Sequence, residues 1–405
     1  MSRSADYTIQ GFLYQFHKTI LAILESSDDA QITVEGIIED IDIEGGFGIK
    51  AIQCKYHEGQ QAFSLSLVYK PILQMMLHFH SNESLDIKYI LYAYFPNETY
   101  TGAPHPINEQ QISTILTSTD KNYKKYIEAL RGKIDIKKFY DKFSLEFGPS
   151  LDTVATNVRK ALKDNGIHDA YIETLAYPNA IHTIANLSCK HDEQARKVTK
   201  SQFLRILQDI KETAISRWTL ALKSYKMIFQ ARRKQLKPNL DKNARLRYFL
   251  ICQSCIDDFS SGIILFISEY LDKYHFKIAH IKTPLFCLDC TEGDFKDIRL
   301  RLHQKRIIVE DGFVCDHFDK TLFFREPMSR KISRTEVERE FRVRLLRFSP
   351  TEVVPLLNEH KSDDLFIIGN GRYDELQIQD VNMERLAARN LQEIKYLIGV
   401  SNVYE

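Results

Sequence analysis

The chain has 405 residues, of which 44% are apolar and 27% charged, and its formal net charge is +1. This balance is typical of an ordinary globular protein and excludes collagen-like, coiled-coil and intrinsically disordered chains. No apolar run approaches the roughly 18 residues of a membrane-spanning helix, the first residues lack the apolar core of a signal peptide, and the 7 cysteines are not densely spaced as in a disulfide scaffold, so we expect a cytoplasmic protein.

The N-terminal quarter of the chain has the pattern of a compact α/β unit. Apolar side chains recur at three- and four-residue steps from Ile9 to Leu24, which predicts an amphipathic helix. Residues 32–58 are β-branched and partly alternating, with a glycine-rich turn after residue 44, and are expected to form strands. A helix is predicted from about Pro71, and the apolar segment 86–96 is predicted to be a buried strand.

The remainder of the chain is divided by a basic segment. Residues 106–240 are expected to be mostly helical, and the polar stretch RRKQLKPNLDKNARLR marks a boundary. Residues 241–405 mix strand-like and helical patterns, with helix starts at Ser333 and Ser349, each three residues before a glutamate. We therefore predict an α/β protein with three regions, a compact α/β domain at 1–105, a mostly helical middle at 106–240 and a mixed α/β region at 241–405.

Three polar residues in the first region suggest a hydrolytic site. Asp40 ends an apolar strand pattern, and the next strand carries Gln53 and Lys55, which share a face because they are two residues apart. Asp40 and the Gln53 carbonyl would suit a hard divalent cation such as Mg²⁺ or Mn²⁺. Lys55 would position the attacking water and offset the charge that develops on a phosphodiester.

This arrangement resembles the PD-(D/E)xK nuclease superfamily, with glutamine in place of the usual acid as in its Mrr-type restriction branch. The segments GFLYQ, VEGIIEDIDI and IQCKYH look like the nuclease domain of antiphage effectors of the CBASS and Lamassu type. The resemblance covers residues 5–100 and implies a restriction-endonuclease-like core of helix, mixed sheet and helix. It also implies a magnesium-dependent endonuclease that cuts double-stranded DNA and is restrained until a partner senses infection. That partner would be an SMC-like ATPase with an accessory subunit, and a homo-oligomer is possible.

The resemblance assigns roles to further residues. Glu35 would be a catalytic residue beside Asp40, Gln53 and Lys55, and Gln15 would be auxiliary. His57 closely follows the motif and could assist proton transfer, because histidine titrates near neutrality, or it could be a strand-end residue without a role. Glu39 or Asp42 would replace Asp40 as ligand if the register differs, because adjacent strand residues face opposite sides of a sheet.

Basic and cysteine-rich segments offer two further signals. A basic stripe at 217–247 could follow a phosphate backbone or form a solvated helix face, and its candidate DNA-binding residues are Arg232, Arg233, Lys234 and Lys237. Arg342, Arg344 and Arg347 are expected on the solvated face of a helix. Two Cys-x-x-Cys units have zinc-ligand spacing but apolar surroundings, which favours buried thiols over zinc: Cys252 with Cys255 and Cys287 with Cys290.

Two other functions remain open from the sequence. One is a stand-alone Mrr-type restriction enzyme whose C-terminal region reads DNA, and the other is an interaction protein on a degenerate nuclease fold. No phosphate-binding loop of the GxxxxGK[ST] type is present, so we do not expect the chain to be an ATPase.

Overall fold

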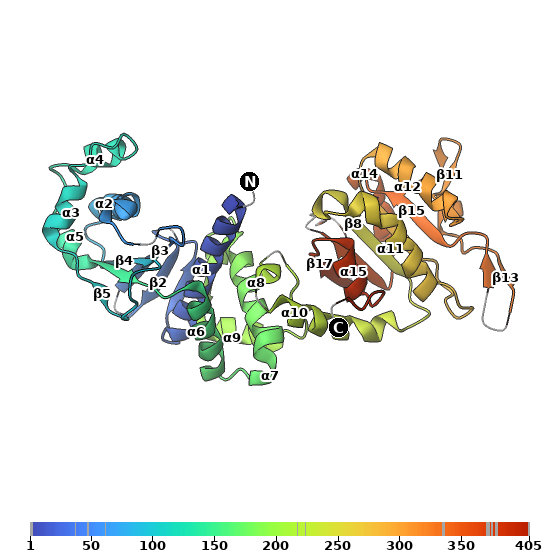
Figure 1. Cartoon of the computed structure of the whole chain (residues 1–405), viewed down its shortest axis with the longest axis horizontal. Coiled ribbons are helices and arrows are strands. Elements are labelled where there is room, and N and C mark those ends of the chain that lie inside the picture. The colour runs from blue at the N-terminus through green and yellow to red at the C-terminus, as the bar shows by residue number, and fades with distance from the viewer. Residues whose placement is uncertain are drawn as a thin grey trace. The chain divides into compact units, whose positions relative to one another are not determined.

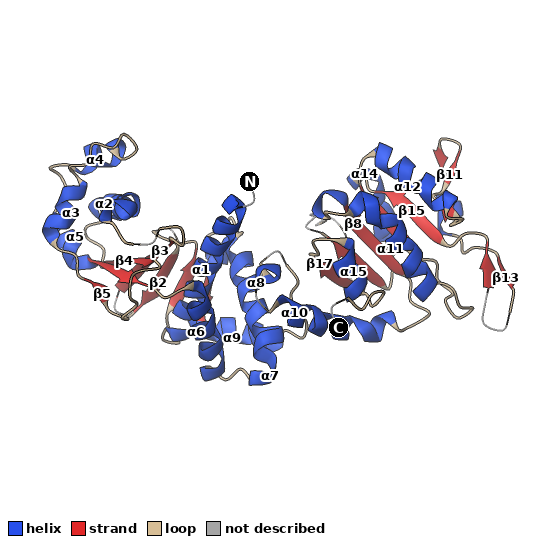
Figure 2. Cartoon of the chain, in the orientation of Figure 1, coloured by secondary structure: helices blue, strands red, loops and turns tan. Residues whose placement is uncertain are grey.

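The computed structural model describes residues 3–36, 38–46, 48–60, 62–216, 218–222, 224–333, 337–369, 373, 376 and 380–403, with only the backbone for residues 3–7. The chain folds into two compact units, residues 1–214 and residues 215–405 (Figure 1). Both contain helices and a central sheet, so the predicted α/β fold class is confirmed (Figure 2). Within the described ranges, no helix combines the length and apolarity needed to cross a bilayer.

The first unit is built on a mixed sheet, in which the described strands follow the order β5-β6-β4-β3-β2-β1-β7. β3, β4 and β6 run parallel, whereas the neighbours at both sides are antiparallel. The strands are β1 (Gln31–Val34), β2 (Ile41–Gly45), β3 (Gly48–Tyr56), β4 (Ile87–Tyr94), β5 (Pro104–His105), β6 (Phe143–Phe147) and β7 (Lys197–Thr199).

Helices cover both faces of this sheet. α2 to α5 share one apolar core with one face, and α1 packs on the other face together with α6 and α8 (Figure 1). Tyr14 of α1 lies against Tyr56, Tyr92 and Tyr94, which line that second face. The helices are α1 (Arg3–Glu25), α2 (Tyr69–Ser81), α3 (Glu109–Ile115), α4 (Lys124–Leu130), α5 (Ile136–Lys142), α6 (Leu151–Asp164), α7 (Asp169–Tyr171), α8 (Tyr177–Ser188) and α9 (Lys200–Asp209).

The predicted boundary at residue 105 falls inside this unit. β6 pairs with β4 and β7 pairs with β1, although both come from the region expected to be a separate helical middle. A strand edge left by residues 1–105 alone would expose unpaired amide and carbonyl groups, and the later strands satisfy them. The first domain therefore extends to residue 214.

The second unit has a sheet whose described strands are all parallel, in the order β10-β15-β9-β8-β16-β17. Its central strands are continuous apolar runs, as expected for strands buried on both faces. The strands are β8 (Arg247–Cys252), β9 (Leu285–Asp289), β10 (Val309–Glu310), β15 (Val343–Arg347), β16 (Asp364–Ile368) and β17 (Asn382–Leu386), with separate hairpins β11 (Phe313–Val314) to β12 (His317–Phe318) and β13 (Ser329–Lys331) to β14 (Val337–Arg339).

Helices flank this second sheet as well. Aromatic side chains of α11 pack on Phe249 and Phe286 of one face, where α12 and α15 also contact α11. Apolar side chains of α13 and α14 belong to the core on the other face. The helices are α10 (Tyr225–Leu240), α11 (Phe259–Tyr274), α12 (Glu292–Gln304), α13 (Lys320–Phe324), α14 (Pro350–Glu359) and α15 (Leu391–Leu397).

Two local predictions in this unit were wrong, and one is confirmed. Ser333 does not start a helix, since it follows β13 of the β13–β14 hairpin, and Glu336 lies outside the described residues. Arg344 lies in strand β15 and is 2% exposed, because its guanidinium donates to the backbone carbonyls of Thr283, Phe323, Phe324 and Arg325. α14 begins after Ser349, as predicted.

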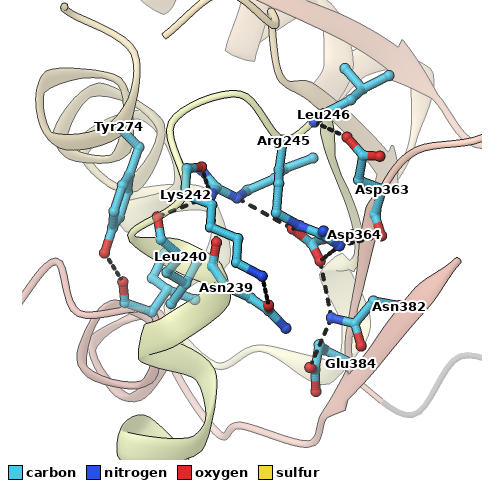
Figure 3. A network of polar contacts seen from close by, with 12 residues as sticks. Asn239, Leu240, Lys242, Arg245, Leu246, Tyr274, Asp363, Asp364, Asn382 and Glu384 are labelled. Atoms are coloured by element: carbon cyan, nitrogen blue, oxygen red, sulfur yellow. Dashed lines mark hydrogen bonds and ion pairs between the residues drawn. The ribbon is translucent and has the colours of Figure 1, made fainter. Parts of the chain in front are cut away.

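Most arginines of the basic stripe that the structure describes form hydrogen bonds or ion pairs inside the second unit (Figure 3). Arg245 donates to both oxygens of Asp364, at 2.6 and 2.7 Å. Arg247 donates to the carbonyls of residues 239, 240 and 242, which lie at and just beyond the end of α10. Arg232 is buried and forms an ion pair with Glu384.

These contacts correct part of the predicted DNA-binding set. Arg232 cannot reach a phosphate without breaking a buried ion pair. Arg233 is half-buried, donates to Asn402 and lies over the Tyr396 ring. Lys234 and Lys237 are exposed, and their DNA-binding role stays a prediction.

The Arg232→Ala substitution should destabilise the second unit by about 3–5 kcal/mol, because it leaves the buried Glu384 carboxylate without its cationic partner. Urea unfolding measures the loss. The matched control in the same helix is Lys234→Ala, which should stay within about 0.5 kcal/mol of wild type. Equal stabilities for the two variants would contradict the structural role of Arg232.

Candidate active site

A tight turn at residues 35–40 positions the candidate catalytic acid. Glu35 has a positive φ of 50°, and the buried Asp42 carboxylate accepts hydrogen bonds from the amides of Ile38 (3.0 Å) and Glu39 (3.2 Å). A Cβ atom at Gly36 would lie 2.3 Å from the Asp42 carboxylate, so glycine is required there. Asp40 therefore ends a turn and directly precedes β2, whereas the sequence pattern predicted it at the end of a strand.

This turn corrects two related predictions. Strand alternation does not apply to Glu39 and Asp40, so they are not forced to opposite faces of a sheet. Asp42 is not a candidate metal ligand, because its oxygens hold the turn amides. The predicted glycine turn between the next strands is confirmed, with Gly48 at a φ of 98°.

The structure brings Asp40 beside the other two predicted site residues. β2 pairs with β3 through Ile41 and Ile52, and Asp40 continues this register toward Gln53. The Asp40 Oδ2 atom accepts a hydrogen bond of 2.7 Å from the Cys54 amide. Gln53 and Lys55 lie on the face of β3 that also carries buried Ala51, the face packed by α2.

Buried charge distinguishes this cluster from an ordinary sheet surface. Burial raises the pKa of the Asp40 carboxyl, while the Cys54 amide and the Lys55 ammonium lower it in part. Burial and then the Asp40 charge raise the pKa of Glu39 to about 8, and Lys55 again opposes the shift. The cluster thus holds more carboxylate than its single lysine neutralises, and an added cation would relieve the repulsion.

The two other acidic and amide residues predicted for the site also meet. Gln15 of α1 donates from Nε2 to Glu35 Oε1 at 2.9 Å. Burial, followed by the Asp40 charge, raises the pKa of Glu35, and the bond from Gln15 and the charge of Arg196 lower it. Arg196 also donates to the Glu35 backbone carbonyl. The first helix is therefore tied to the turn that carries Asp40.

Two buried polar atoms near Lys55 have no hydrogen-bond partner among the described residues. They are the Oε1 atom of Gln53, whose side chain is 9% exposed, and the Nε2 atom of His57. His57 stacks on Phe95, with ring centroids 4.7 Å apart, and burial and Lys55 lower its pKa, which favours the neutral imidazole. A buried carbonyl oxygen without a donor is available as a ligand for a cation.

These donors fit a magnesium ion better than a transition metal. Asp40 and Gln53 offer hard oxygens, and Mg²⁺ commonly takes one or two protein oxygens and retains several waters. In the described parts of the chain, no three His, Cys, Asp or Glu side chains form a group that could hold a metal. An all-protein cage of the zinc kind is therefore not formed by those residues.

A basic groove on the opposite face of the same sheet was not predicted. Its volume is about 580 Å³, and it is lined by Lys18, Lys50 and Lys88 as well as Glu25 and Glu146. Lys50 stands directly opposite Lys88 in the register of β3 and β4, a like-charge pair that costs stability. Lys50 and Lys88 each follow an isoleucine near the start of their strand, a signal that becomes readable only once the strand pairing is known.

No protein-family model matches the chain, and no curated protein is significantly similar to it in sequence. A function for this site is therefore inferred from its geometry and from the resemblance of its motif.

The Glu39→Gln substitution should flatten the dependence of stability on pH. Because the folded protein raises the Glu39 pKa from 4.5 to about 8, it binds this proton more tightly than the unfolded chain, and the resulting stability is lost as pH rises through about 8. Between pH 5 and pH 9 the wild type should lose about 2–4 kcal/mol more than the variant, as measured by urea unfolding.

The exposed Glu58→Gln serves as the control and should keep the wild-type slope. Parallel curves for wild type and Glu39→Gln would show that Glu39 does not carry the shift.

Proposed function

We propose that the first unit is a metal-dependent endonuclease domain that cuts double-stranded DNA, within an antiphage effector of the Lamassu-like kind. The observation that carries this proposal is the meeting of Asp40, Gln53 and Lys55, with a buried Gln53 oxygen that receives no hydrogen bond from any residue the structure describes. The resemblance to PD-(D/E)xK nucleases, which rests on the same residues, supplies the reaction type.

The residues of the site would divide the work of phosphodiester hydrolysis. Asp40 and Gln53 would hold Mg²⁺ or Mn²⁺, which when bound polarises a phosphoryl oxygen and lowers the pKa of a water. Lys55 would orient the attacking water and stabilise the negative charge that builds on phosphorus. Glu35 and Gln15 would hold the turn in place, and neutral His57 would accept or relay a proton.

The second unit would restrain the nuclease or dock it to a partner protein. The protein would act in the cytoplasm. This role follows from the resemblance, which implies an SMC-like ATPase and an accessory subunit as partners, and self-association is a further option. Lys234 and Lys237 are exposed on the second unit, and the groove lysines are exposed or half-buried on the first. We place phosphate contacts away from the scissile bond at Lys50 and Lys88, which belong to the same unit as the site but lie on the opposite face of its sheet.

Purified protein should nick supercoiled plasmid with Mg²⁺ but not with EDTA, and Lys55→Ala should slow the reaction by at least about 100-fold. The control is Lys124→Ala, on the exposed face of α4, which should cut like wild type. Equal cutting by wild type and Lys55→Ala would remove the catalytic assignment. Fragments with defined ends would favour a stand-alone restriction enzyme.

A restrained effector need not cut when isolated, so metal binding provides a second measurement of the same prediction. Mg²⁺ should raise the thermal midpoint of the wild type, because a ligand of the folded state stabilises it, and it should leave Asp40→Asn unchanged. Identical shifts in both proteins, together with no cutting, would favour the interaction protein on a degenerate fold.

The double substitution of Lys50 and Lys88 by alanine should weaken binding to duplex DNA and lower the salt slope of binding by about 2, since each phosphate contact contributes roughly 0.9. Fluorescence anisotropy at several salt concentrations measures both quantities. The comparison variant replaces Lys234 and Lys237. A larger loss in that variant would assign DNA contact to α10 instead of the groove.

A further inference from the structure

Two cysteines meet at the end of strand β8 in the second unit. Cys252 is the last residue of β8, and Gln253–Cys255 forms a single 3₁₀ turn before α11. Side chains three residues apart lie above one another in a 3₁₀ turn. The Sγ atoms of Cys252 and Cys255 are accordingly only 3.1 Å apart.

We propose that Cys252 and Cys255 form a redox-active dithiol that closes to an intramolecular disulfide. The two thiols differ in access: Cys252 is 6% exposed, whereas Cys255 is half-buried and open to a small oxidant. Ser254 also contacts the Cys252 sulfur at 3.2 Å. One accessible thiol beside one shielded thiol is the arrangement in which the first attacks the oxidant and the second resolves the product.

The neighbouring strand enforces this geometry. β16 ends at Ile368, and Gly369 follows with a φ of 96°. A Cβ atom at Gly369 would lie 2.7 Å from the Cys255 Cβ and 3.2 Å from the Cys252 Cβ. Glycine is therefore needed at this position, because a side chain there would clash with the turn that brings the two thiols together.

The second Cys-x-x-Cys unit supplies a comparison with the same spacing. Cys287 lies within strand β9 and is 1% exposed in the core, and Cys290 follows the end of that strand. Three residues of extended chain span about 10 Å and turn the side chains to opposite faces. The short Sγ–Sγ contact of Cys252 and Cys255 therefore belongs to the 3₁₀ turn and does not follow from the sequence spacing alone.

Glutathione disulfide, a small disulfide present in cells, can oxidise the pair in two exchange steps. The Cys255 thiolate attacks one sulfur of glutathione disulfide and releases one glutathione thiolate. The Cys252 thiolate then attacks the mixed disulfide at the Cys255 sulfur and releases the second. The dithiol loses two electrons and two protons, and both protons pass through solvent to the two glutathione thiols.

The test uses the full chain equilibrated with reduced and oxidised glutathione in varying ratio, then quenched in acid, unfolded in denaturant, alkylated and analysed by peptide mass mapping, so that buried thiols also react. In the wild type, the peptide that contains Cys252 and Cys255 should lose two hydrogens and resist alkylation. The pair Cys287 and Cys290 should remain alkylatable. Exposed Cys189 and Cys315 report that the oxidant has acted, because they should take up glutathione.

Two variants separate the proposal from a general oxidation. Cys252→Ser should convert Cys255 to a glutathione adduct, whereas the Cys287→Ser, Cys290→Ser double variant should oxidise like wild type. If Cys252 and Cys255 are both alkylated in fully oxidised glutathione, while Cys189 and Cys315 carry glutathione, the proposal is overturned. Oxidation of Cys287 with Cys290 at a lower oxidant ratio would overturn it equally.

Discussion

One buried carboxylate organises the candidate site. Asp42 holds the amides of Ile38 and Glu39, and this is possible only because Gly36 has no side chain where the carboxylate lies. The resulting turn delivers Asp40 to the edge of β3, where its carboxylate bonds to the Cys54 amide in place of a strand neighbour. Without this turn, Asp40 would have no fixed position relative to Gln53 and Lys55.

The turn concentrates negative charge in a poorly solvated place. Glu35, Glu39 and Asp40 all have raised pKa values, mainly because they are buried, and Lys55 is the cation that acts on Glu39 and Asp40. Such an arrangement costs stability in the absence of a compensating ion. Functional sites commonly retain such costly groups, because the buried charge serves binding or catalysis. The uncompensated Gln53 oxygen adds a polar cost of the same kind.

Local periodicity predicted much of this site, because its geometry is set within about 20 residues. The two-residue spacing of Gln53 and Lys55 and the glycine turn before β3 were readable directly. The turn that holds Glu35, Ile38 and Glu39 was missed, because an apolar residue such as Ile38 looks like a strand continuation. Its determinant is a side-chain contact between Gly36 and Asp42 that periodicity does not encode.

Long-range pairing explains the larger errors. Arg232 and Glu384 are 152 residues apart, so a basic run could not be distinguished from a buried ion-pair partner. Arg344 has the alternating charge pattern of a surface, yet backbone carbonyls from a distant segment satisfy its guanidinium. The end of the first unit was likewise hidden, because β6 and β7 become strands through pairing with β4 and β1.

The pairing of β7 with β1 has a consequence for synthesis of the chain. β7 begins at Lys197, and the neighbouring Arg196 bonds to the carbonyl of Glu35 at the turn that precedes Asp40. A ribosome must therefore release roughly the first half of the protein before the turn gains its final support, since a nascent chain folds only after it emerges. Copies that end before β7 would therefore lack both the strand that pairs with β1 and the Arg196 contact that supports the turn.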